Sequence, residues 1–304
     1  MEDITLSEAA RRLGVSSTDI EDLQAFLADR EAEADRDPDT EPTLETLKHE
    51  DRGLANDLAA RVSEAGAMLM IDLETGGRQY YEQVYEGRPV WPGNVSGITI
   101  GVGYDLAFYS EATFRRDWAL LGQTVLDHVV NEGCIGARPP HKTPDQVKAL
   151  RRRVRDIQIR WDDAIAVYKA VMLPSWALKT HNALPNCNLL NGDCFGALVA
   201  LTLNRGEDKY ARPGDRYREM REIKAAMQVK NFAAIPRLIR SMIRIWVDTD
   251  IEQQMRRARN AEARLFEIGL AARATRCACP IFTGKAGNRR SIGPISRQWE
   301  KAKG

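Results

Sequence analysis

The chain has 304 residues, of which 29% are charged and 7% are aromatic, a composition typical of a soluble globular protein with one large domain or two modest ones. The net charge of +1 combines a balance of −11 over residues 1–60 with one of +12 over the remainder. A basic body suits a polyanionic partner such as cell wall, nucleic acid or anionic lipid, and charge alone does not choose among them. No apolar run approaches the ~18 residues that a spanning helix needs, so we expect no stable membrane insertion.

The N-terminal 60 residues predict a short acidic helical region. Residues 5–29 carry two stretches of apolar residues at helical spacing, each with a Ser or Thr that can cap a helix. The acidic, proline-containing stretch DREAEADRDPDTEP that follows is typical of a linker. The first residues, MEDITLSEAARR, have neither the basic part nor the apolar part of a secretory signal. We therefore expect synthesis in the cytoplasm, and a docking or delivery role for residues 1–60.

The rest of the chain is mainly helical by its apolar periodicity. A helical pattern runs from Leu44 to about Glu74 and stops at a double glycine, which suits a helix C-terminus. Residues 80–108 are rich in Tyr, Val, Ile and Gly and predict β structure. Later helices are expected at 111–121, 144–171, 193–204, 217–228, 231–247 and 250–270. This order predicts an α+β, mainly helical fold with one small β subdomain, a main domain over 61–272 and a basic, flexible tail over 273–304.

The cysteines and histidines do not predict a metal site. The five cysteines show no zinc-binding spacing, and an odd number without a framework is typical of free thiols in a protein made in the cytosol. The alternative is a disulfide between Cys187 and Cys194 in an oxidising compartment. The four histidines are scattered along the chain. We expect neither a metal nor another cofactor.

Glu74 is the last carboxylate of the predicted long helix, just before its glycine cap. The negative end of the helix dipole disfavours a charged carboxylate, and apolar neighbours such as Leu69 and Leu73 add desolvation. Both effects favour the neutral form, which the proton donor in glycosidic bond cleavage must have. The alternative interpretation is an ordinary, solvated surface glutamate.

The stretch SGITIGVGYDL, residues 96–106, alternates like a strand with one nearly bare face. The expected core side carries Ile98, Ile100, Val102 and Tyr104, and the opposite side carries only Thr99, Gly101, Gly103 and Asp105. A straight strand would separate the Thr from the Asp by about 20 Å, so we expect the chain to bend at the two glycines. Glycines also leave room for a ligand to approach the backbone. The alternative is a plain hairpin edge with a capping Asp.

Together these segments resemble the phage-type lysozymes (muramidases). TIGVGYDL after a helix that ends in a Glu is similar to the family's TIGxGH signature. FGALVALTLNRG (195–206) resembles its central helix, which ends in Asn-x-Gly, and RRARNAEARLFEIGL (256–270) resembles its closing RRxxEAxLF helix. The resemblance covers roughly residues 61–270 in the same order, with a long helical insertion around 122–190. It implies a two-lobed lysozyme-like fold with a β-hairpin subdomain, which cleaves the β-1,4 bond between N-acetylmuramic acid and N-acetylglucosamine.

One position departs from the common phage enzymes, which carry an Asp nine residues after the catalytic Glu. Here that position is Gln83, and the nearby acids are Glu82 and Glu86. The bacteriocin pesticin and its relatives instead place the Asp six residues beyond the Thr, where Asp105 stands. The resemblance is therefore nearest to a pesticin-like lysozyme domain.

This resemblance implies roles for three side chains. Glu74 protonates the leaving glycosidic oxygen, and Asp105 acts as general base on a water oriented by the Thr99 hydroxyl. It also implies inversion, which requires carboxyl groups roughly 6.5–9.5 Å apart. Glu82 and Glu86 are the alternative candidates for the base.

The resemblance also implies substrate contacts. Gly101 and Gly103 leave room for the glycan strand. Tyr104 stands where the family has a His, and it either contacts sugar or packs in the core. Asn204 either lines the cleft or ends its helix as a C-cap.

Three further residues carry weaker expectations. Trp91 either stacks on a sugar face or packs in a turn or the core, which is the more frequent place for a Trp. Arg259 and Glu262 are expected to form a structural helix–helix ion pair.

The leading hypothesis is an enzyme that binds peptidoglycan glycan strands. A phage endolysin or an antibacterial effector or bacteriocin would act in the periplasm or cell wall of a target cell, and the acidic N-terminus favours a delivered effector. An immunity protein or a secretion-machine component is then an expected partner. The alternative is a catalytically inactive lysozyme-like domain that binds peptidoglycan or a partner protein. Nucleic acid is not an expected partner, because the N-terminus is acidic and basic and aromatic residues are not interleaved.

Overall fold

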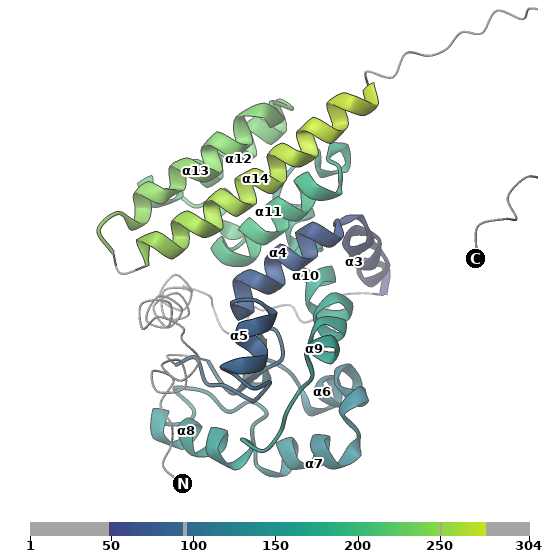
Figure 1. Cartoon of the computed structure of the whole chain (residues 1–304), viewed down its shortest axis with the longest axis vertical. Helices are drawn as coiled ribbons and strands as arrows, with labels where there is room; N and C mark the ends of the chain where they lie inside the picture. Colours follow the sequence, from purple (N-terminus) through teal and green to yellow (C-terminus); the bar gives the residue numbers. More distant parts are fainter. Residues whose placement is uncertain (1–48, 94–95, 250, 278–304) are drawn as a thin grey trace, which may run out of the picture.

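The computed structural model describes residues 49–93, 96–249 and 251–277, and over these residues the protein is mainly helical with one two-stranded antiparallel sheet (Figure 1). The helices predicted within 5–29, the acidic linker and residues 278–304 of the predicted tail lie outside the described residues. The predicted boundaries at residues 60 and 272 fall inside helices α3 (His49–Arg61) and α14 (Glu252–Cys277). No helix in the described ranges is both long enough and apolar enough to cross a membrane.

The long helix predicted up to Glu74 is interrupted. After α3, helix α4 (Glu64–Thr75) begins at Ser63, an extended residue whose hydroxyl accepts a hydrogen bond from the Gly66 N–H at 3.0 Å. It ends at Gly76, which has φ +74°, as the double glycine predicted. Helix α5 (Arg78–Gln83) follows at once. The prediction of β structure from residue 80 is therefore wrong for this segment.

The bend predicted at the glycines is confirmed. Strand β1 (Thr99–Ile100) pairs with β2 (Tyr104–Asp105), and the turn between them passes through Gly101 at φ +57° and Gly103 at φ +70°. The four residues expected on the core side are all at most 2% exposed, namely Ile98, Ile100, Val102 and Tyr104. The hairpin therefore packs one face in the core, whereas on the other face Thr99 is 8% exposed and Gly101, Gly103 and Asp105 are half-buried.

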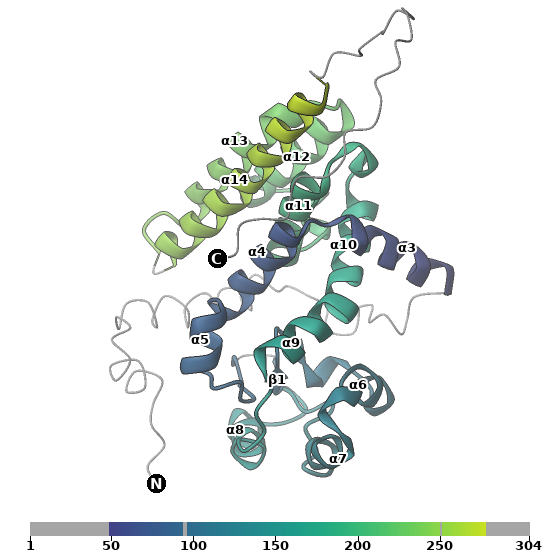
Figure 2. The same cartoon turned by 45° about the vertical axis from the view of Figure 1, so that its right-hand side comes forward.

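Short helices surround the hairpin and form the lower group in Figures 1 and 2. They are the 3₁₀ turns η1 (Leu106–Phe108) and η2 (Ala119–Leu121) and the helices α6 (Glu111–Asp117), α7 (Gln123–Asn131) and α8 (Pro144–Arg153). The helix predicted over 144–171 is broken, because residues 154–160 form turns and an extended segment. Beyond it α9 (Trp161–Val167), the π-helical η3 (Tyr168–Met172) and α10 (Leu173–Ala183) run on without a gap and lead to the upper group.

The upper group packs around α11. It contains η4 (Cys187–Leu189), α11 (Gly192–Arg205), η5 (Asp208–Tyr210), η6 (Asp215–Tyr217), α12 (Arg218–Gln228), η7 (Phe232–Ala234), α13 (Ile235–Ser241), η8 (Met242–Trp246) and α14. Nearly all of α11 is buried, and it packs against both α4 and α14. At the crossing with α4, a Cβ on Gly66 would stand 2.9 Å from the Gly196 Cα. Two glycines thus let the backbones touch and set the direction of the helix that carries Glu74.

Three cysteines are buried free thiols, which confirms the prediction of free thiols at these positions. They are Cys134, Cys187 and Cys194. The Cys187 and Cys194 thiols donate to different backbone carbonyls, those of Leu184 and Phe266, both at 3.3 Å. The disulfide between them that the sequence left open is therefore not formed.

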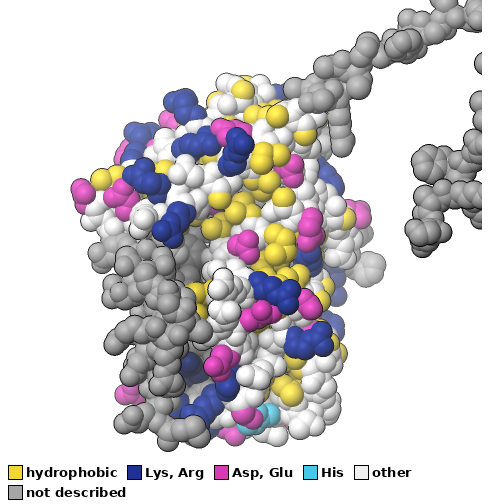
Figure 3. Space-filling model, viewed as in Figure 1, with side chains coloured by type: hydrophobic (Ala, Val, Ile, Leu, Met, Phe, Trp, Pro, Cys, Tyr) yellow, Lys and Arg dark blue, Asp and Glu magenta, His cyan; other side chains and the backbone are white. Residues whose placement is uncertain are grey.

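The face of the molecule seen in Figure 1 carries charges of both signs. Figure 3 shows Lys and Arg side chains interspersed with Asp and Glu, and hydrophobic side chains between them. Among the described residues visible in this view, basic and acidic side chains are therefore mixed.

Candidate active site

Glu74 lies on the last turn of α4, half-buried, with its carboxylate against the turn of the hairpin. A Cβ atom added to Gly103 would stand 3.1 Å from Glu74 Oε2. The carboxylate therefore lies next to the space that a side chain at this position would fill. Gly103 also has a φ of +70°, which L side chains rarely adopt. The bare strand face thus borders the predicted acid.

Thr99 and Asp105 are direct cross-strand partners. Thr99 exchanges both of its backbone hydrogen bonds with Val90 on its other side. The Thr99–Asp105 pair is therefore of the non-hydrogen-bonded kind, in which facing Cα atoms are about 4.5 Å apart and the side chains lie close on one face. The hairpin brings together a hydroxyl and a carboxylate that are six residues apart in the chain.

The Asp105 carboxylate is held by the backbone. It accepts hydrogen bonds from the Gly97 N–H at 3.0 Å and from the Ala107 N–H at 2.9 Å, and so caps η1. A Cβ on Gly97 would stand 2.7 Å from the Ala137 carbonyl oxygen, so this approach needs a glycine. These two hydrogen bonds fix the direction of the carboxylate and use part of its capacity as a hydrogen-bond acceptor.

The two candidate carboxylates flank the second glycine of the hairpin turn. The Glu74 carboxylate lies beside Gly103, and Asp105 follows that glycine by two residues, so the Gly103 and Asp105 Cα atoms are at most about 7 Å apart. The inversion that the resemblance implies requires carboxyl groups about 6.5–9.5 Å apart, whereas retaining enzymes use about 5–5.5 Å.

Two predicted substrate contacts pack against core side chains instead. Tyr104 is 1% exposed, its ring stacks on Tyr109 with centroids 3.8 Å apart, and its hydroxyl donates to Asp117 at 3.1 Å. Burial and the nearby Asp117 carboxylate raise the pKa of Tyr104 far above its ordinary value. A Cβ on Gly101 would stand 3.0 Å from Trp118 Cζ2. Tyr104 therefore packs, and Gly101 makes room for an indole ring rather than for a ligand.

Asn204 lies on the last turn of α11, where its Oδ1 accepts a hydrogen bond from Arg259 at 2.9 Å. The C-cap is Gly206. Arg259 also pairs with Glu262 at 2.8 Å, and both side chains are 0% exposed. The ion pair is thus formed, but within α14 rather than between two helices. The hydrogen bond from Arg259 to Asn204 is what joins α14 to α11. Burial raises the pKa of Glu262 to about 7, against the opposing charges of Arg259 and Arg205.

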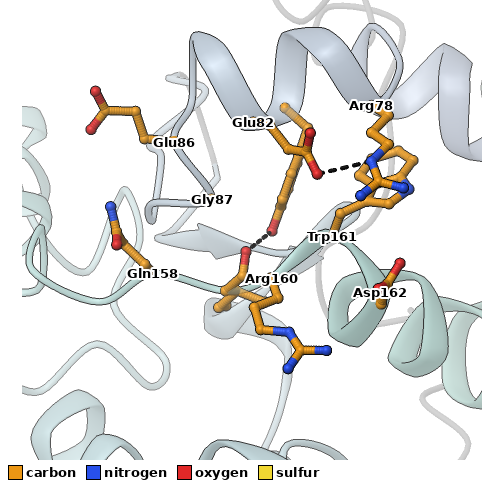
Figure 4. A pocket seen from close by; sticks show the side chains of 10 residues that line it. Arg78, Glu82, Glu86, Gly87, Gln158, Arg160, Trp161 and Asp162 are labelled. Carbon is orange, nitrogen blue, oxygen red and sulfur yellow. Dashed lines mark hydrogen bonds and ion pairs between the residues drawn. The ribbon is translucent and has the colours of Figure 1, made fainter.

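The alternative bases Glu82 and Glu86 lie on α5 and the loop after it. Both are exposed and paired with arginines, Glu82 with Arg78 at 2.9 Å and Glu86 with Arg88 at 2.6 Å. They line a groove of about 540 Å³ that contains neither Glu74 nor Asp105 (Figure 4). The hairpin face therefore has Asp105 as its carboxylate.

Trp91 has a local structural role. It is half-buried, its Nε1–H donates to the Ser96 carbonyl at 2.9 Å, and the Lys148 ammonium lies 5.6 Å from a ring centroid of this Trp. The ring is thus held in its turn by Ser96 and lies near the Lys148 ammonium.

Within the ranges that the structure describes, no group of three or more His, Cys, Asp or Glu side chains is arranged to hold a metal ion. Comparison of the chain with protein-family models, curated proteins and solved structures finds no match. The groove under α5 was not predicted from the sequence. The alternation of Ile157 and Ile159 with Gln158 and Arg160, inside a stretch read as one helix, is the pattern that points to an extended segment there.

Proposed function

We propose that this protein is a peptidoglycan hydrolase that cleaves the β-1,4 bond between N-acetylmuramic acid and N-acetylglucosamine by inversion, in a two-lobed lysozyme-like fold. The observation that supports it most is the position of the Glu74 carboxylate beside Gly103, in the hairpin that pairs Thr99 with Asp105. The choice of peptidoglycan as the substrate rests on the resemblance of TIGVGYDL and of the two later helices to a pesticin-like lysozyme domain.

In the proposed mechanism, Glu74 donates its proton to the glycosidic oxygen as the bond to the leaving sugar breaks. Asp105 removes a proton from a water on the opposite face of the sugar ring, and the Thr99 hydroxyl orients that water. The water oxygen bonds to the anomeric carbon as the leaving oxygen departs, so the configuration inverts. This mechanism requires the two carboxyl groups to be about 6.5–9.5 Å apart, so that the sugar and the water fit between them.

Digestion of purified peptidoglycan by the wild type and by Glu74→Gln tests this proposal. Products are reduced with borohydride and identified by mass spectrometry. Glu64→Gln is the matched control, because Glu64 lies at the other end of α4 in an exposed pair with Lys169. Reducible muramic acid ends from the wild type and the control alone would support the proposal. Anhydro-muramic ends would mean a lytic transglycosylase and would remove the role of Asp105.

The second candidate is a catalytically inactive lysozyme-like domain that binds peptidoglycan or a partner protein. Two observations favour it: Gln83 stands where the common phage enzymes have an Asp, and the Asp105 carboxylate already accepts backbone hydrogen bonds. This candidate would be supported if neither the wild type nor Glu74→Gln released fragments from peptidoglycan while both sedimented with the wall.

The setting we propose is the periplasm or cell wall of a target cell, reached by delivery as an antibacterial effector or bacteriocin, or as a phage endolysin. The acidic residues 1–60 are the proposed docking or delivery element. An immunity protein or a secretion-machine component is the partner expected for an effector. Pull-down from producing cells with the full chain and with a chain lacking residues 1–48 tests whether that segment recruits a partner.

A further inference from the structure

The groove of about 540 Å³ lies between α5 and the segment that leads into α9 (Figure 4). Its floor contains Tyr81 and Trp161, whose ring centroids are 5.3 Å apart. These side chains are only 3% and 5% exposed. A sugar ring needs an open aromatic face for stacking, so this floor is unsuited to a glycan.

The rim of the groove carries charges of both signs, which are Arg78, Glu82, Glu86, Arg160 and Asp162. The pair between Arg78 and Glu82 has both side chains widely exposed, at 61% and 45%. Exposed pairs of this kind contribute little to stability, so a ligand can exchange with either partner. Arg160 is 76% exposed and lies 3.5 Å from Asp163. The rim therefore suits a ligand that carries carboxylates and an ammonium group.

One wall of the groove is an extended segment with an open edge. Ile157 and Ile159 are buried, whereas Gln158 and Arg160 are exposed, as in a strand. The Ile159 N–H donates to the Gly87 carbonyl at 2.8 Å, and its carbonyl accepts from the Tyr81 hydroxyl at 3.1 Å. The backbone groups of Gln158 therefore point the other way. No backbone hydrogen bond joins Gln158 to another residue of the described ranges, so its N–H and C=O are open to a peptide that lies along the groove.

We propose that this groove binds the peptide that branches from the muramic acid of peptidoglycan, an inference that rests on the proposed function. That peptide carries carboxylates and, where its third residue is a diamino acid, an ammonium group, whereas N-acetylated sugars carry no ammonium. The peptide can also reach the groove. Arg78 follows Glu74 by four residues, which places their Cα atoms at most about 14 Å apart. An extended pentapeptide spans about 17 Å.

Binding of a synthetic stem peptide, L-Ala-γ-D-Glu-diaminopimelate-D-Ala-D-Ala, tests the proposal directly. The peptide is titrated by calorimetry into the full chain with Glu74→Gln, which keeps cleavage out of the measurement. Arg160→Glu is added as the test and Arg152→Glu as the control, because Arg152 is also exposed but lies outside the groove. We expect Arg160→Glu to weaken binding at least tenfold and the control to leave it unchanged. Absence of binding, or equal binding by both variants, would overturn the proposal.

Cleavage assays separate this proposal from the proposed function. Glycan strands with their peptides, and strands stripped by an amidase, are offered to the wild type and to Arg160→Glu. We expect the variant to raise KM for the peptide-bearing strands and to leave the stripped strands unaffected. Equal KM changes on both substrates would show that the groove does not read the peptide. If the wild type cuts neither substrate, the proposed function is wrong. The calorimetry then still shows whether the groove binds the peptide.

Discussion

Replacement of Gly103 by alanine tests the proposed position of Glu74 with one added methyl group. That methyl would meet Glu74 Oε2 at 3.1 Å, so the carboxylate must move by a few tenths of an ångström or more. The φ of +70° adds strain, which for left-handed backbone is about 1–2 kcal/mol. Because a 1 Å misplacement of a catalytic group can lower a rate about 100-fold, we expect kcat to fall roughly 10- to 100-fold.

Gly133→Ala is the matched control. Gly133 has a φ of +71°, and a Cβ there would meet nothing within 4 Å, so the control carries similar strain without contact with Glu74. We expect each variant to lose about 1–2 kcal/mol of unfolding free energy in urea, or about 2–8 °C in Tm. Release of dye from labelled peptidoglycan at saturating substrate then measures kcat. If both variants retain the wild-type kcat while folded, the carboxylate does not act from this position and the reasoning is wrong.

Three further predictions concern other parts of the molecule. Thr99→Val keeps the shape of the side chain and removes its hydroxyl, so it should lower kcat about tenfold or more, whereas Thr99→Ser should retain most of the activity. Equal rates of dye release by the two variants would show that the hydroxyl has no role. Gly196→Ala would place a Cβ 2.8 Å from the Gly66 Cα and should lower the unfolding free energy in urea by about 1–3 kcal/mol. At Gly53 an added Cβ would meet nothing within 4 Å, so Gly53→Ala should stabilise α3 by about 0.5–1 kcal/mol. Burial raises the pKa of Glu262 from 4.5 to about 7, so the folded state binds more protons than the unfolded state between these values. The unfolding free energy should therefore fall by about 2–3 kcal/mol from pH 5 to pH 8. Glu262→Gln should flatten this dependence, and an unchanged slope would assign it to another group.

The hairpin was predictable because its pattern is local. The alternation of Ile98, Ile100 and Val102 with small or polar residues assigns the buried face, and the glycines mark where the chain must turn. The end of α4 is local in the same way, since a double glycine terminates a helix whatever lies around it. The sequence therefore placed Glu74 at a helix end and Thr99 on the face of Asp105.

The contacts that the sequence missed come from distant parts of the chain. The outward side of a strand reads as one bare face, but the turn directs Gly101 toward Trp118, which lies seventeen residues later in the chain. Likewise the Tyr104 ring finds Tyr109 and the Asp117 carboxylate, which no alternation pattern reveals. The segment at Arg78 reads as β-like by composition, yet it forms a helix whose Tyr81 is buried beside Trp161. Tertiary packing overrides propensity in these places.

The two proposed catalytic carboxylates are positioned by different means. Asp105 is fixed locally, because Gly97 and Ala107 donate to it from within one short loop. Glu74 is fixed by a helix whose direction depends on a glycine crossing with α11. Movement of the upper helices relative to the hairpin would therefore shift the acid and leave the base in place. The Glu74 carboxylate contacts the hairpin at Gly103. The absence of a side chain at Gly103 therefore determines how closely the proposed acid approaches the strand that carries Asp105.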